Sequence, residues 1–72
     1  MDAATRQLLL DGLAEALKAA VVGEFTVFLN APAADFGSAK TRAAAGMALA
    51  VQTYHASVEI VVGLNSTGDT HG

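Results

Sequence analysis

Polar and hydrophobic side chains are segregated with helical spacing over the first part of the chain. The polar positions fall within one arc of a helical projection: Gln7, Asp11, Glu15 and Lys18. The apolar positions fill the opposite arc: Leu9, Leu10, Leu13, Leu17, Ala20 and Val21. Asp2 is a suitable N-cap, and Gly23 is a typical helix stop. The pattern predicts an amphipathic helix over Ala3–Val22.

The following segment, Glu24–Asn30, is rich in aromatic and β-branched residues, a composition that favours a strand. In such a strand Phe25, Val27 and Leu29 would share one face. Phe28 would lie on the other face, so we expect both faces to be at least partly covered.

A loop is predicted over Ala31–Gly37, which separates the two halves of the chain. Pro32 cannot donate a hydrogen bond to a β-ladder, and Gly37 permits backbone angles that other residues avoid. Ser38 is then a suitable cap for a second helix, which we predict over about Ala39–Tyr54.

The predicted second helix is poor in large side chains. Its dominant apolar face holds Ala43, Met47, Ala50, Val51 and Tyr54, and the weakly polar opposite face holds Ala45, Leu49 and Gln52. Gly46 and Ala50, four residues apart, would let another helix approach closely. Alanine is also simply a good helix former, and this second explanation stays open.

Two interpretations compete for Ser57–Leu64. Alternation places Val58, Ile60, Val62 and Leu64 on one face of a strand and Glu59, Val61 and Gly63 on the other. Helical spacing also connects Met47, Val51, Tyr54, Val58 and Val62, which would extend the second helix. The β-branched run favours the strand, because such side chains are stiff and fit a pleated surface.

The predicted fold class is therefore α+β, a small single domain over residues 1–64 ordered helix–strand–helix–strand and completed by oligomerisation. The alternative is a mostly α chain with a long second helix. Residues 65–72 are predicted to form a polar, mobile C-terminal tail. Short matches between the halves, such as Thr5-Arg6 with Thr41-Arg42 at a spacing of 36, suggest a degenerate repeat, although alanine-rich chains match themselves easily.

A segment without formal charge, Ala43–Val58, carries the clearest functional indication. A chain of 72 residues is too short to enclose this segment on every side, so we expect a further protein surface to cover it, most simply a second copy of the chain. The residues predicted to form this interface are Ala43, Gly46, Met47, Ala50, Tyr54 and Phe28.

Charge and composition exclude several kinds of site. The net charge is -3, and the four cations, Arg6, Lys18, Lys40 and Arg42, are scattered, which disfavours nucleic-acid binding by the monomer. An oligomer could still gather Lys40 and Arg42 into a ring. The absence of cysteine excludes disulfides and thiolate metal sites.

The sequence favours neither export nor a membrane span. The first residues lack a basic region followed by an apolar one, so we expect no signal peptide. The apolar stretch over residues 43–64 is interrupted by polar residues, so no membrane span is predicted. We expect a cytoplasmic or virion-associated protein.

Candidate chemistry is sparse. His55 and Glu59 lie four residues apart and could share a metal on a continuous helix, but two ligands are too few. Asp35-Phe36-Gly37 is a chance match to a kinase tripeptide and is interpreted as a turn. We predict no catalytic residue, no cofactor, no metal and no small-molecule ligand.

The leading hypothesis is a small non-enzymatic structural or accessory subunit that acts by homo- or hetero-oligomeric assembly, such as a component of a bacterial or phage particle. The alternative is a small regulatory binding module, antitoxin-like or an effector subunit, that covers a partner protein. A weaker third hypothesis is an enzyme whose site forms across subunits from Tyr54, His55 or Asp35.

Overall fold

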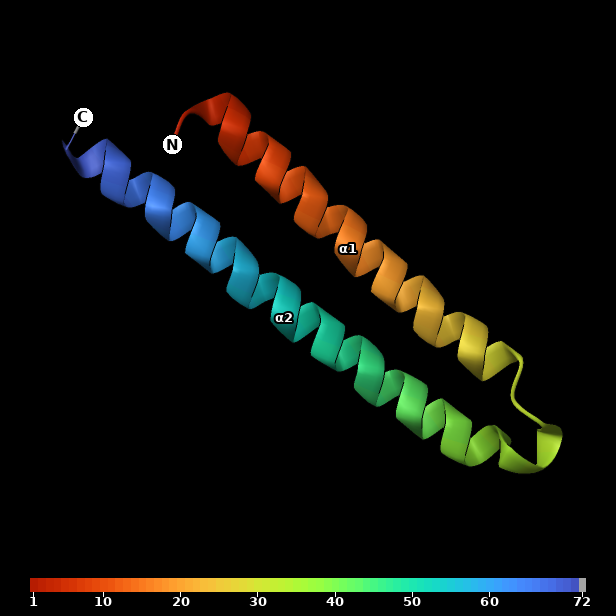
Figure 1. Ribbon diagram of the computed structural model, residues 1–72. Coiled ribbons are helices and arrows are strands. Elements are labelled where there is room, and N and C mark those ends of the chain that lie inside the picture. Colours follow the sequence, from red (N-terminus) through yellow and green to blue (C-terminus); the bar gives the residue numbers. More distant parts are fainter. Residues whose placement is uncertain (72) are drawn as a thin grey trace.

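The chain folds as a hairpin of two long α-helices. In the computed structural model, α1 spans Ala3–Leu29, a short 3₁₀ helix η1 spans Ala33–Asp35, and α2 spans Phe36–His71. The helices run antiparallel and side by side, with the chain ends at one end of the hairpin and η1 at the other (Figure 1). The structure describes the backbone of residues 1–71 and the side chains of residues 1–63.

The predicted α+β order is wrong, because the described backbone contains no strand. The first predicted strand, Glu24–Asn30, is the last part of α1 and the residue that follows it. The second, Ser57–Leu64, lies inside α2. The alternative prediction, a mostly α chain with a long second helix, describes the fold. The degenerate repeat suggested by the matches between the two halves has no helix–strand counterpart in the described backbone. The side chains of the predicted tail lie outside the described residues.

A single stripe of inward positions explains why α1 continues through Gly23. The least exposed residues of α1 recur at helical spacing along its whole length: Arg6, Leu10, Leu13, Leu17, Val21, Glu24 and Phe28. By contrast, the face of the predicted strand is largely in solvent, since Phe25 is 48% exposed and Val27 and Leu29 are each 72% exposed. Contact with α2 therefore overrides the local β-propensity of this segment.

The matching stripe on α2 has the same spacing. Its inward positions are Ala39, Ala43, Gly46, Ala50, Tyr54, Ser57 and Val61. In both helices the steps are 4, 3, 4, 4, 3 and 4 residues. This is the 11-residue pattern of about 3.67 residues per turn, close to that of a straight α-helix, so the two stripes stay in contact without strong supercoiling.

The β-branched run near the end of α2 is helical for the same reason. Val61, predicted to point away from the strand's buried face, is only 9% exposed and lies on the inward stripe. Ile60 is 64% exposed and Val62 is 46% exposed, although both were predicted to be buried. Because a β-branched residue in a helix costs only a few tenths of a kcal/mol, burial of Val61 is enough to favour the helix.

Local contacts fix the turn between the helices. The side-chain amide of Asn30 donates to the carbonyl of Thr26 at 2.8 Å and closes the end of α1. The rings of Phe28 and Phe36 meet with centroids 4.8 Å apart, which joins the end of α1 to the start of α2. The predicted cap Ser38 lies inside α2, where its hydroxyl donates to the carbonyl of Asp35 at 3.1 Å.

The hairpin is one layer thick. The Cα positions extend over 59 × 16 × 6 Å. Their radius of gyration is 16.8 Å, whereas a compact chain of this length has a radius of about 11 Å. Among the described side chains only Ala39, Ala43 and Val61 are buried. Stable domains are built from at least two packed layers, so the hairpin has the form of half a domain.

Replacing Gly23 by alanine is expected to stabilise the protein by about 0.5–1 kcal/mol, because glycine is a poor helix residue. A β-carbon there meets no atom within 4 Å, and no described glycine has a positive φ angle. Thermal unfolding followed by circular dichroism measures the change, and Gly23→Pro, which should cost about 3 kcal/mol, is the control. A loss of stability in Gly23→Ala would mean that the helix ends at Gly23.

The cap of α1 predicts a pH dependence. Oδ1 of Asp2 accepts the Thr5 amide at 2.7 Å, and this backbone hydrogen bond lowers the pKa of Asp2 below its usual 3.8. The stabilisation of the first turn of α1 by the ionised Asp2 carboxylate is therefore present above pH 3.8. It is lost as the pH falls through the lower pKa that Asp2 has in the folded state.

Backbone chemical shifts of Ala3–Thr5 should become less helical on acidification. The Asp2→Asn variant should keep the cap but lose this pH dependence. In the Asp2→Ala variant the first turn of α1 should fray at every pH. An unchanged titration in Asp2→Asn would assign the effect to another group.

Candidate assembly surface

One side of the hairpin carries a shallow apolar groove between α1 and α2. It consists of two hollows of about 340 and 460 Å³, which both contact Leu13 and Ser57 and so continue one another. Toward the chain ends the groove is bordered by Leu8, Leu9 and Ile60. Toward the turn it ends at Glu24 and Gly46. The groove therefore has an apolar end and a polar end.

The two walls of the groove differ in side-chain size. In the hollow nearer the turn, the α1 wall beyond the half-buried Leu13, Leu17 and Glu24 is formed by the small residues Ala16 and Ala20. In the hollow nearer the chain ends, Gly12 lies beside the exposed Leu8 and Leu9. The α2 wall carries Leu49 and Ile60, which are 63% and 64% exposed. In the hollow nearer the turn, a low α1 wall thus lies beside the larger side chain of Leu49.

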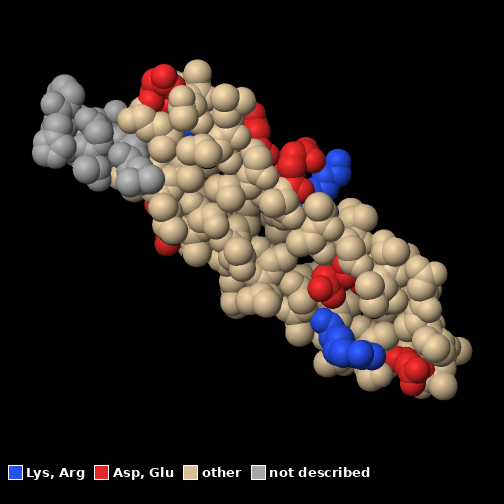
Figure 2. All heavy atoms as spheres, viewed as in Figure 1, with Lys and Arg blue, Asp and Glu red and all other residues tan. Residues whose placement is uncertain are grey.

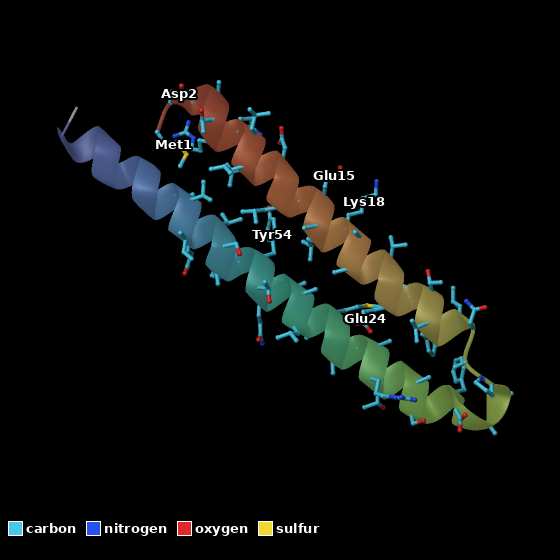
Figure 3. The ribbon with its side chains drawn as sticks, viewed as in Figure 1. Met1, Asp2, Glu15, Lys18, Glu24 and Tyr54 are labelled. Atoms are coloured by element: carbon cyan, nitrogen blue, oxygen red, sulfur yellow. The ribbon has the colours of Figure 1, made fainter. Side chains whose placement is uncertain are left out.

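Glu24 lies opposite Gly46 at the turn end of the groove. It extends from α1 into the space between the helices, as Tyr54 does from α2 (Figure 3). A β-carbon at Gly46 would lie 2.5 Å from Oε1 and 2.6 Å from Oε2 of Glu24, so a side chain there would displace this carboxylate. Among the described side chains, Glu24 has neither a hydrogen bond nor an ion pair.

The opposite side of the hairpin is also apolar. Its exposed apolar side chains are Val22, Phe25 and Leu29 on α1, and Val51 and Val62 on α2. Phe25 and Leu29 are rotated roughly 140° and 180° around α1 from the groove residue Ala20. The hairpin is therefore apolar on both broad sides, with most of one visible side uncharged (Figure 2).

Most charged groups are placed along the edges and near the turn, whereas Arg6 and Glu24 lie on the inward stripe of α1. Glu15 and Lys18 point away from α2, along the outer edge of α1 (Figure 3). Arg42 precedes Leu49 by seven residues, two helical turns, and so lies on the groove side of α2 toward the turn. Arg42 and Glu24 make the turn end of the groove polar.

The six predicted interface residues lie largely between the two helices of one chain. Ala43 is 6% exposed, and the others are half-buried: Phe28, Gly46, Met47, Ala50 and Tyr54. Gly46, Ala50 and Tyr54 also line the groove, so they have one side in contact within the chain and one side accessible. Their contact with another chain stays a prediction. The groove residues Leu49, Ile60, Ala16 and Ala20 were not predicted as interface residues.

The remaining candidate groups do not converge. Nε2 of His55 lies 3.7 Å from Oε1 of Glu59, one turn along α2, and their side chains are 74% and 68% exposed. Within the part of the chain that is described, no group of three histidine, aspartate or glutamate residues could hold a metal ion. Asp35 lies in η1, far along the hairpin from this pair.

Neither helix, over the described residues, contains a stretch that combines the length and hydropathy of a membrane span.

Comparison of the chain with protein-family models, with characterised proteins and with solved structures finds no significant match. The inference of function therefore depends on the geometry of the hairpin itself.

Gly46→Leu is expected to destabilise the hairpin by about 1–3 kcal/mol, because the side chain would enter the contact between the helices. Gly46→Ala should change stability by less than about 1 kcal/mol, since better helix propensity offsets the displacement of the flexible Glu24 carboxylate. Denaturant unfolding measures both. In a Glu24→Ala background, Gly46→Ala should become stabilising. If Gly46→Leu has no effect, the helices do not pack at this point.

Proposed function

We propose that this protein is a small non-enzymatic structural subunit that acts by self-assembly. The observation that carries the proposal is the single-layer hairpin, whose Cα positions extend only 6 Å in the thinnest direction, with no side chain wholly buried among those described. Self-assembly supplies the second layer that a helical domain needs.

The exposed area supports this proposal quantitatively. The hairpin exposes 5143 Å², whereas a compact monomer of 7.3 kDa exposes roughly 4,200 Å². The excess of roughly 1,000 Å² is close to the ~800 Å² that each partner buries in a standard protein interface. The excess is thus enough area for one interface of standard size.

The second apolar side favours a larger assembly. When the groove side is covered, Val22, Phe25 and Leu29 remain available for a further contact. A component of a bacterial or phage particle, cytoplasmic or virion-associated, has this requirement for more than one interface. The same residues also support a second candidate, a regulatory module that uses its second side to cover a different protein.

The native mass tests the proposal. At micromolar concentration, light scattering should give a multiple of 7.3 kDa. Self-assembly alone should suffice, without added protein, nucleic acid or metal. A monomer at every concentration tested would reject the structural-subunit proposal, and a monomer that forms a stoichiometric complex with another protein would support the binding module.

A further inference from the structure

We infer that the groove is filled by the groove of a second copy, with a twofold axis parallel to the helices and both turns at the same end. This inference rests on the proposed self-assembly and adds the interface and its orientation. The resulting dimer is a four-helix bundle in which α2 of each copy packs on α1 of the other.

The unequal walls of the groove are self-complementary in this orientation. A twofold axis along the hairpin places the α2 wall of one copy over the low α1 wall of the other at the same level. Leu49 shares its hollow with Ala16 and Ala20, so in the dimer it lies over the partner copy's equivalent small residues.

The other face-to-face arrangement fits poorly. A twofold axis across the hairpin would place α2 on α2 and α1 on α1. The exposed Leu49 and Ile60 side chains would then meet one another, and the small residues of α1 would face a gap. Interior packing at normal density excludes such voids.

The charges are compatible with this orientation. With the turns together, the polar ends of the two grooves meet. Each Glu24 then lies about one helical turn from Arg42 of the other copy. Two carboxylates and two guanidinium groups then balance one another.

Spin labels at single introduced cysteines measure the orientation, since the chain contains no cysteine of its own. A label at Ala33→Cys, in η1, should give an inter-copy distance below about 30 Å, because adjacent helices in a bundle lie 8–10 Å apart. A label at Thr5→Cys, at the other end of the hairpin, should also give a short distance. With the turns apart, the distance between the Ala33→Cys labels would instead approach the 59 Å length of the hairpin, and this result would overturn the inference.

A matched pair of variants identifies the side that is used. The variants Leu49→Asp and Val51→Asp each place a carboxylate on α2, the first on the groove side of the hairpin and the second on the opposite side. Both positions are exposed in the single chain, Leu49 to 63% and Val51 to 52%. Leu49→Asp should raise the dissociation constant of the dimer at least tenfold, and Val51→Asp should change it by less than threefold. The reverse result would overturn the inference but leave self-assembly intact, whereas a monomeric parent chain would reject both.

Discussion

Two antiparallel helices can bury only the stripe along which they touch, and this constraint governs the whole molecule. Each helix presents one inward position per turn, and the inward positions of α2 are mostly alanine, glycine and serine. Small residues allow a close approach, which leaves room for Leu13, Leu17 and Phe28 but encloses none of them completely. The stability of the fold therefore depends on what the outer sides contact.

The position of Glu24 shows how this close approach is used. A carboxylate on the inward stripe would normally open the contact, but Gly46 has no side chain and accommodates it. The carboxylate reaches the groove, where it makes one end polar. One glycine thus permits both the close packing of α1 against α2 and a polar end to an otherwise apolar groove.

The start and body of the first helix over Ala3–Val22, its Asp2 cap and a break around Pro32 were predictable from the sequence, because they depend on local spacing and backbone chemistry. The stop predicted at Gly23 was wrong, since α1 continues to Leu29. The helical state of Phe25–Leu29 and Val58–Val62 was not predicted from composition, because aromatic and β-branched residues favour strands locally. The signal that could have corrected it is the 4-3-4 spacing that runs unbroken across Gly23 to Phe28. The groove was missed because it forms from two helices, and Leu49 lies on the outer face when α2 is considered alone.

Concentration dependence of thermal unfolding tests the central claim most directly, because an interface that completes the fold must couple stability to protein concentration. The account predicts that the midpoint of unfolding, followed by circular dichroism, rises steadily over a hundredfold range of concentration. It also predicts that helicity falls at the lowest concentrations. A cooperative transition with the same midpoint and helicity throughout that range would contradict the account, since the single-layer hairpin would then be stable without a second layer.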